Sequence, residues 1–476
     1  MATPSFPIVG LQDSPPSTRT LSQLEGRCRR RMPELQSMCS RVRERLQFLH
    51  DRVAPLDPED PVKLKYIAVV VAFVKLLRVK PLLQRLSSSE TLVTILRELQ
   101  LKLSDIAEVF GVADTPEMTE WIDHWEDDRA LQFSVLNDLV PESEATMLQS
   151  EFRGDGELQR TLMAIDSSLS WTNQAPEMWE LKRKTRDRVA GDLNIQGLRV
   201  FPWFIPIDDV EFEREPIGDT GTFGVARRGT WTHNGERTDV VVKELYIESS
   251  QDPQHLFLRQ LEMWKSLDHE RILKLHGGSH VSSPPFYVCE NAHHGNLVDF
   301  LRDDRHGVMF WRLFQQVAEA LQFLQSKNIV HGALRCTNIL IGANFTAKIS
   351  DFSFSSVRTL SAGLSKESSD ASEKTVRWKP QEVLRSTGGE APLFASDIYS
   401  LAMSMIEAKA EAPFPDYLDD DMAKEHILAG GSHPRPDDVF SDEEWAFVSR
   451  LCHPNHAERP TIEQVLEEIH VFAQEE

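Results

Sequence analysis

The chain has few of the residues that cross-link small folds or hold metal ions. Its 476 residues include only five cysteines, and no two of them form a CxxC pair. This excludes a disulfide framework and a zinc site built on such pairs, and we expect reduced thiols, as in a cytoplasmic protein. The five are Cys28, Cys39, Cys289, Cys336 and Cys452.

Long hydrophobic runs are also missing. The longest, Tyr66 to Val74, stops at Lys75 and is well short of the roughly 18 residues that a membrane-spanning helix needs. The chain does not begin with a basic segment followed by an apolar one, so the sequence predicts no secretory signal.

Basic charge is scarce, because the formal net charge is −22. A nucleic-acid-binding protein needs a basic face to neutralise phosphates, so that function is excluded for the chain as a whole. A hydrophobic content of 41% with 26% charged residues is ordinary for a soluble protein. The length predicts two or three domains, since one hydrophobic core does not grow this large.

The N-terminal part has a helical pattern. Residues 1–18 are rich in Pro, Ser and Thr and are expected to form a disordered arm. From 19 to 150 apolar residues recur at steps of three and four, which predicts a helical bundle. The first helix, 19–53, should be kinked or split by Pro33.

Turn and capping residues predict where the other helices begin and end. A second helix starts near Pro61, is apolar on most sides and is expected to be the buried one. A third follows the serines at 87–89, and a fourth runs from about 116 to 149. A helical connector should occupy 151–206. We interpret the acidic residues of 123–128 as a hydrated helix face rather than metal ligands, because they are spread around the helix.

Beyond about residue 207 the periodicity changes. Short β-branched runs alternate with glycine and asparagine turns, and long helical patterns follow after 296. This order predicts a second domain of the α+β class over 207–475, with a small sheet followed by helices.

A glycine-rich segment lies between two of the strand-like runs. Gly218, Gly221 and Gly224 would let the backbone approach phosphates closely, although hairpin turns are also rich in glycine. The segment has one residue more than the G-x-G-x-x-G spacing. Lys243 ends the apolar strand Val240–Val242, where it could meet an anion or simply reach solvent.

Several further motifs follow in a fixed order. His331-Gly332-Ala333 lies seven residues before Asn338, counted from His331, and Asp351-Phe352-Ser353 comes after a short apolar run. The remaining motifs are Phe286–Leu297, Arg377–Glu382, Ser396–Ser400 and Ala457–Thr461. Together these motifs resemble a protein kinase domain of the tyrosine-kinase-like group, over about residues 207–475.

The resemblance implies a bilobal kinase-like domain that binds ATP and Mg²⁺. Cys289 would be the gatekeeper residue, and Trp264, Leu275, His331 and Phe352 would form the hydrophobic spine. Asn338 and Asp351 would hold the metal ion. The expected nucleotide-binding residues are Gly218, Gly221, Gly224, Val225, Val241, Lys243, Glu290, Ala292 and Leu340. Glu382 and Arg459 would form a buried ion pair.

Three departures from the kinase pattern affect chemistry. Ala333 stands where the family has the Asp that accepts the proton of the substrate hydroxyl, and Gly332 replaces the preceding Arg. Gln260 stands where family spacing places the Glu that pairs with the strand lysine, and Glu262 should point elsewhere. The phosphate loop has its additional residue. We therefore expect no catalytic residue and predict a pseudokinase that signals by conformational switching and partner binding.

Two other functions stay open from the sequence. An active Ser/Thr kinase would fit Arg335, which occupies the place of the catalytic-loop lysine, since positioning and metal carry much of phosphoryl transfer. A membrane-acting bundle controlled by a pseudokinase resembles mixed-lineage kinase domain-like proteins in layout. Residues 19–53 contain nine Arg and four acidic residues, with a cluster at Arg27 and Arg29–Arg31. This cluster could meet anionic lipid or dock on the acidic remainder of the chain.

The segment between Asp351 and Glu382 is rich in serine, including Ser365, Ser368, Ser369 and Ser372. Phosphorylation could order it against basic side chains, or it could be an ordinary polar loop.

Overall fold

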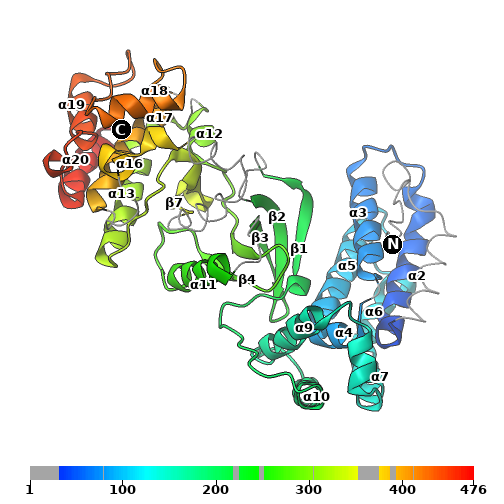
Figure 1. Cartoon of the computed structure of the whole chain (residues 1–476). Helices are drawn as coiled ribbons and strands as arrows, with labels where there is room; N and C mark the ends of the chain where they lie inside the picture. The colour runs from blue at the N-terminus through cyan, green and yellow to red at the C-terminus, as the bar shows by residue number, and fades with distance from the viewer. Residues whose placement is uncertain are drawn as a thin grey trace. The chain divides into compact units, whose positions relative to one another are not determined.

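The computed structural model describes residues 32–78, 80–217, 224–245, 251–303, 305–351, 375–385, 393–410 and 412–476, with the side chains of 251–256 left out. The chain forms two compact units (Figure 1). The first contains residues 1–211 and 231–238, and the second contains 212–230 and 239–476.

The first unit is helical. Its described helices are α2 (Gln36–Val53), α3 (Pro61–Leu76), α4 (Leu82–Ser87), α5 (Ser89–Val109), α6 (Pro116–Asp123), α7 (Trp125–Glu142), α8 (Ala145–Ser150), α9 (Asp155–Ser168) and α10 (Pro176–Asp192), with short 3₁₀ turns at Pro33–Leu35 and Ile207–Asp209.

Local sequence explains the first helix boundaries. Pro33 opens the short 3₁₀ turn ahead of α2, and because the expected first helix before residue 32 lies outside the described residues, its interruption at this proline stays a prediction. Asp60 caps α3 by accepting a hydrogen bond from the Val62 N–H, and Pro61 occupies its first position. Gly111 follows α5 with a φ of +65°, a conformation that favours glycine at the end of a helix.

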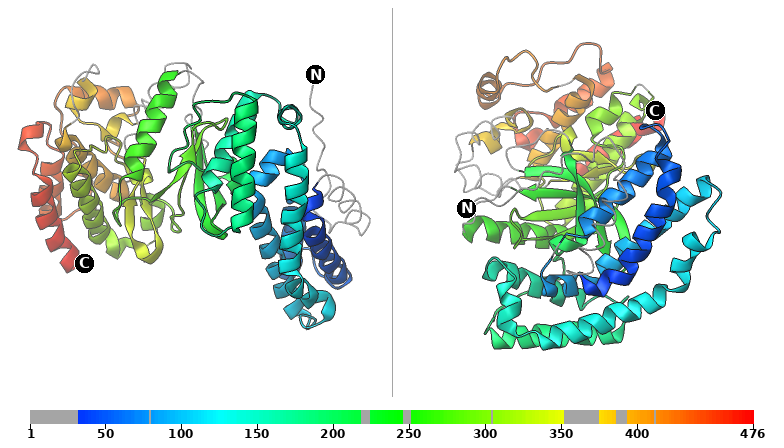
Figure 2. Two further views of the ribbon diagram at one scale, coloured as in Figure 1. Left: turned by 90° about the horizontal axis from the view of Figure 1, so that it is seen from below. Right: turned by 90° about the vertical axis from the view of Figure 1, so that its right-hand side faces the viewer.

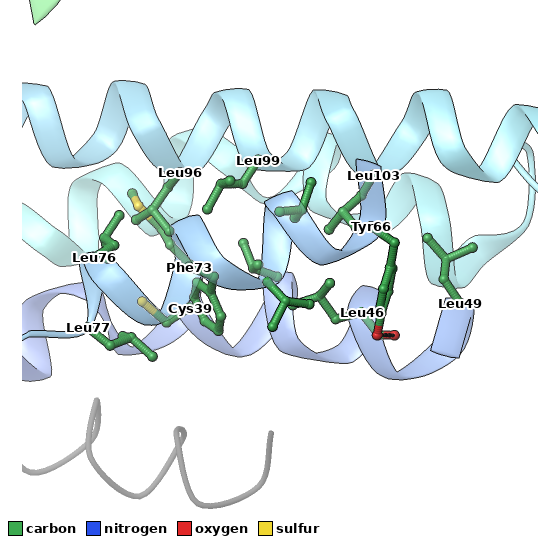
Figure 3. Packing of buried hydrophobic residues seen from close by; sticks show 14 of the residues in the cluster. Cys39, Leu46, Leu49, Tyr66, Phe73, Leu76, Leu77, Leu96, Leu99 and Leu103 are labelled. Carbon is green, nitrogen blue, oxygen red and sulfur yellow. Dashed lines mark hydrogen bonds between the residues drawn. The ribbon is translucent and has the colours of Figure 1, made fainter. Parts of the chain in front are cut away.

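Two hydrophobic clusters form the core of this unit. The first joins α2, α3 and α5, whose buried side chains point toward one another in Figure 3. Leu46, Tyr66, Phe73 and Leu99 are each at most 2% exposed. The second cluster draws on α4, α7, α8, α9 and α10, with Leu83, Leu136, Leu162 and Val189 among its fully buried members. In the described helices, the apolar residues that recur at steps of three and four therefore form the hydrophobic core.

Several details differ from the sequence-based expectations. Helix α3 is not buried on all sides, because Leu64 is 53% exposed and Val71 47% exposed. The expected fourth helix is divided into α6, α7 and α8, and α4 was not foreseen. Asp128 is not on a hydrated face, because it is buried and accepts a hydrogen bond from Arg41 Nε at 2.7 Å.

The second unit begins with a five-stranded sheet in the order β1-β2-β3-β5-β4. Strands β3 and β5 are antiparallel, with Lys243 opposite Tyr287 and Val241 opposite Cys289. The strands are β1 (Val210–Pro216), β2 (Gly224–His233), β3 (Glu236–Leu245), β4 (Leu275–Ser279) and β5 (Phe286–Glu290), and helix α11 (Gln251–Lys265) lies between β3 and β4 in sequence.

Helices dominate the C-terminal part of this unit, coloured yellow-green to red in Figure 2. Helix α13 packs along α20, and α17 packs against α19. A two-stranded hairpin, β6 (Ile339–Ile341) and β7 (Ala347–Ile349), precedes Asp351. The helices are α12 (Leu297–Leu301), α13 (Phe310–Ser326), α16 (Gln381–Arg385), α17 (Phe394–Ala410), α18 (Asp420–Leu428), α19 (Asp442–Leu451) and α20 (Ile462–Glu475), with 3₁₀ turns at Gly307–Met309, Cys336–Asn338, Ala343–Phe345, Val376–Trp378 and His456–Glu458.

The α+β fold class is confirmed, with a helical region followed by a five-stranded sheet and further helices. The expected ion pair in the C-terminal part is also present. Arg459 Nη1 lies 2.6 Å from Glu382 Oε1, and the Arg459 side chain is 0% exposed. In the part of the chain that the structure describes, no helix is long and apolar enough to cross a membrane.

Candidate nucleotide and metal site

One face of the sheet gathers several of the predicted site residues. Because side chains alternate along a strand, Val241 and Lys243 share one face of β3, and their partners Cys289 and Tyr287 share the same face of β5. Val240 and Val242 point the other way and are fully buried, which holds β3 in the sheet. The alternation along β3 therefore places Lys243 on the face of the candidate site.

Lys243 contacts the predicted metal ligand Asp351 directly. Its Nζ lies 2.5 Å from Asp351 Oδ2, and the two side chains are 21% and 15% exposed. The Tyr287 hydroxyl donates a hydrogen bond of 2.8 Å to Asp351 Oδ1. Asp351 has a φ of +59°, a left-handed conformation that is uncommon for residues other than glycine and is found at functional sites. The structure thus brings together two residues predicted from the sequence and one that was not.

The β6–β7 hairpin places Asn338 next to this group. Asn338 immediately precedes β6, and its carbonyl accepts hydrogen bonds from the N–H (2.9 Å) and the Oγ (3.1 Å) of Ser350. The side-chain Nδ2 of Asn338 donates to the carbonyl of Ala333 at 2.7 Å. Because the nitrogen is used in this way, Oδ1 is the end of the amide that offers lone pairs to a cation.

A carboxylate from α17 holds the catalytic-loop segment. Asp397 accepts hydrogen bonds from the backbone N–H of His331 (2.7 Å) and of Gly332 (2.9 Å). Burial raises the pKa of Asp397 to about 6, although both hydrogen bonds favour its charged form. Gly332 has a φ of +70°, which glycine adopts without strain. The loop is therefore well ordered, yet the methyl group of Ala333 cannot accept a proton.

Helix α11 carries the position that would supply a charged partner for Lys243. Gln260 occupies this place and has no charge, and Glu262 is exposed, in line with the expectation that it points elsewhere. Trp264 is 1% exposed, its Nε1 donates to the Leu273 carbonyl at 2.8 Å, and its ring meets the Tyr287 ring edge-on at 5.2 Å. Leu275 and His331, two other expected spine residues, are likewise buried.

The end of β5 and the turn that follows it contain the residues expected to meet the adenine. The Glu290 carboxylate accepts a hydrogen bond from the Lys274 N–H at 2.7 Å and lies 2.8 Å from Lys348 Nζ. Burial raises the pKa of Cys289 to about 12, so its thiol stays protonated. Ala292 accepts from the Gly295 N–H, which closes a turn after the strand. Val241 and Leu340 are half-buried.

Part of the predicted site lies outside the described residues. Gly218 and Gly221 belong to this part, as do Phe352, the serines at 365–372 and the basic cluster of the first helix. Gly224 is described, and a Cβ at this position would overlap the carbonyl oxygen of Glu244. Its glycine is therefore required by the close approach of β2 to β3, whether or not a phosphate binds. Val225 beside it is 2% exposed.

Two residues of this region were missed in the sequence. Asp397 lies in the Ser396–Ser400 motif, but nothing in that motif indicates which backbone groups it holds. Tyr287 lies in a run of apolar residues and reads as ordinary strand core. One signal was available, because a tyrosine two residues before Cys289 shares its face, and a buried phenol normally needs a hydrogen-bond partner.

The donor set fits a hard divalent cation. Asp351 offers a carboxylate and Asn338 an amide oxygen, which are oxygen ligands of the kind that Mg²⁺ binds together with phosphate oxygens. The Lys243 ammonium lies beside them and would face the phosphates. Among the described residues, no group of three or more His, Cys, Asp and Glu side chains forms a separate metal site.

Two comparisons relate the chain to known proteins. The chain is similar to the protein "Activated Cdc42 kinase-like" of Drosophila melanogaster, with 31% identity over 165 residues. That stretch covers 33% of this chain and 12% of the relative, so the likeness is confined to a small part of the longer protein. Residues 213–469 match the family described as protein tyrosine and serine/threonine kinase. Because this match covers more than half of the chain, the protein belongs to the protein tyrosine and serine/threonine kinase family.

Proposed function

We propose that the kinase domain is a pseudokinase of the tyrosine-kinase-like group that binds Mg²⁺ and ATP and signals through a change of conformation. The observation that carries the proposal is the contrast within one site. Lys243, Asn338 and Asp351 lie where phosphates and a cation would be held, whereas the base position is occupied by Ala333. The residues expected to bind nucleotide and cation are therefore present, whereas the residue that would accept the proton is not.

The residues of the site would bind different parts of the Mg²⁺–ATP complex. Asp351 and the Oδ1 of Asn338 would hold the cation, and Lys243 would neutralise phosphate charge. The bound cation would neutralise the negative charge of the phosphates. On the adenine side, the backbone of Glu290 and Ala292 would pair with the base, beside Val241, Cys289 and Leu340. The glycines 218, 221 and 224, with Val225, would cover the phosphates.

The proposed mode of action is switching rather than turnover. Trp264, Leu275 and His331 are buried, as expected for packing that responds to the nucleotide. We place the protein in the cytoplasm, with signalling proteins as partners. The helical region would pass the change on to them. A division into an arm at 1–18, a bundle at 19–150, a connector at 151–206 and a kinase-like domain at 207–475 is part of the same proposal.

Residual Ser/Thr kinase activity is the second candidate. The observation that favours it is the direct contact between Lys243 and Asp351, because positioning and metal binding supply much of the barrier reduction in phosphoryl transfer. The two candidates differ in one quantity, the transfer of the γ-phosphoryl group to any acceptor.

A thermal-shift titration tests nucleotide binding. ATP with Mg²⁺ should stabilise the parent protein by RT ln(1 + [L]/Kd), which is about 2.7 kcal/mol at a hundredfold excess over Kd. Lys243→Met should lose this stabilisation. Lys327→Met, on the exposed end of α13, is the matched control and should keep it. Absence of a shift at millimolar ATP, or an equal shift in Lys243→Met, would contradict the proposal.

A further inference from the structure

Tyr287 combines three contacts that ordinary strand core does not have. It is 2% exposed, its ring packs edge-on against Trp264, and its hydroxyl donates to Asp351 Oδ1 at 2.8 Å. Lys243 Nζ lies 5.9 Å from the centroid of the same ring, and the two residues face each other across β3 and β5. The tyrosine therefore contacts both members of the Lys243–Asp351 pair.

We infer that Tyr287 is a positioning residue that fixes the Asp351 carboxylate for a divalent cation bound with nucleotide. Lys243 binds Oδ2 and the Tyr287 hydroxyl binds Oδ1, so both oxygens are oriented. Each carboxylate oxygen has two lone pairs, so one hydrogen bond to an oxygen does not by itself prevent a cation from binding it. The hydroxyl thus orients the ligand without blocking it.

The need for such a residue follows from helix α11. Gln260 stands on this helix in the place of an acidic residue and carries no charge. Lys243 and Asp351 form an ion pair with each other, and Tyr287 on strand β5 contacts both of them. Because the ring is clamped by Trp264 and the sheet, its hydroxyl has little freedom to leave Asp351.

The inference rests on the proposed function for the identity of the ligand, and two measurements separate them. The first uses no nucleotide. Unfolding free energies of the parent, Tyr287→Phe, Asp351→Asn and the double variant form a double-mutant cycle. Phenylalanine keeps the ring packing on Trp264, so a loss that depends on Asp351 reports the hydrogen bond. Additive effects would overturn the inference.

The second measurement is the Mg²⁺ dependence of the ATP-induced thermal shift. In Tyr287→Phe, the Mg²⁺ concentration for the half-maximal shift should rise about tenfold, as expected for loss of one hydrogen bond to a charged group. The shift given by ADP in EDTA should not change, whereas a general loosening of β5 would weaken both. Tyr417→Phe, in the loop before α18, is the control and should match the parent.

The outcomes are distinct. If the parent binds no nucleotide, the proposed function fails, and the cycle alone decides whether Tyr287 holds Asp351. If the parent binds ATP and Tyr287→Phe shows the same Mg²⁺ midpoint, the positioning role is wrong while the proposed function stands.

Discussion

Two ion pairs of the kinase domain join residues that the sequence analysis singled out, and the pairs differ in how deeply their side chains are buried. Arg459 and Glu382 form a closed pair, in which the arginine side chain is 0% exposed and also donates to the carbonyls of His453, Ala395 and Pro454. Lys243 and Asp351 form an open pair, with 21% and 15% of their side chains exposed.

This difference indicates which pair stabilises the fold and which pair is available to bind a ligand. A buried guanidinium with all of its donors used is costly to disturb, because removing one partner leaves a charge buried without compensation. A partly exposed ammonium is compensated by water and gains little stability from its partner. The closed pair should therefore control unfolding, and the open pair should control binding.

Removing the closed pair should have the largest effect. Arg459→Ala should lower the free energy of unfolding by roughly 3–5 kcal/mol, because it removes a fully buried guanidinium with all of its hydrogen bonds and leaves the partly exposed Glu382 with the hydrogen bond from Ser396. Arg450→Ala is a matched control, since its pair with Glu468 is 53% and 37% exposed and should contribute no more than about 1 kcal/mol. Denaturant unfolding of both variants gives the comparison, and equal losses would show that burial does not distinguish the pairs.

Removing the open pair should reverse the pattern. Lys243→Met should change the unfolding free energy of the nucleotide-free protein by no more than about 1 kcal/mol. The same variant should lose the stabilisation by Mg²⁺ and ATP, about 2.7 kcal/mol at a hundredfold excess. Calorimetry with and without nucleotide measures both quantities. A large loss of stability without nucleotide would place this pair among the structural ones.

The pH dependence of stability should distinguish a carboxylate that is paired with an arginine from one whose pKa is set mainly by burial. Burial opposes the charge on Glu382, but hydrogen bonds from Arg459 keep its pKa below the ordinary 4.5. Its contribution is therefore full above pH 4.5 and is lost as the pH falls through the lower folded value. In the helical unit, burial raises the pKa of Asp209 from 3.8 to about 7. Its contribution is full below 3.8 and is lost as the pH rises through about 7.

Calorimetric midpoints across this pH range test both signs. Each pKa unit corresponds to about 1.4 kcal/mol, so the rise in the pKa of Asp209 from 3.8 to about 7 corresponds to an effect of the same order as that of Arg459→Ala. In the parent, Asp209 should make the unfolding free energy fall as the pH rises from about 4 to 7, and Asp209→Asn should remove this fall. Glu382 should make the unfolding free energy rise with pH on the acid side, and Glu382→Gln should remove this rise. Nearby Lys182, whose pKa burial lowers to about 8, also contributes to the profile above neutrality. A change of stability with pH in the opposite direction would contradict the roles given to Asp209 and Glu382.

Restoring the missing groups should have the smallest effect. Ala333→Asp with Gln260→Glu returns a proton acceptor and an acidic partner, and we expect weak labelling from γ-labelled ATP where the parent gives none. The control is the same double change combined with Asp351→Asn, which should stay silent. Failure of the restored variant would point to the additional residue of the phosphate loop.

Much of the kinase domain could be predicted because its motifs fix backbone positions. The strand alone left open whether Lys243 meets an anion or solvent, and Lys243, Asn338 and Asp351 were assigned as site residues through the resemblance to kinase motifs. Tyr287 could not be assigned, since its partner Asp351 is 64 residues away in sequence. In the helical unit, no proline or glycine marks the break at His124, so the sequence pattern did not indicate that α6 ends there.

The central claim is that this site binds nucleotide without transferring its phosphoryl group. The most direct measurement incubates the purified chain with Mg²⁺ and γ-labelled ATP and records bound nucleotide and covalently incorporated phosphate in the same sample. The account predicts bound nucleotide that is lost in Lys243→Met, with incorporation no higher than in Asp351→Asn. Robust incorporation in the parent, abolished by Asp351→Asn, would contradict the account and identify an active kinase.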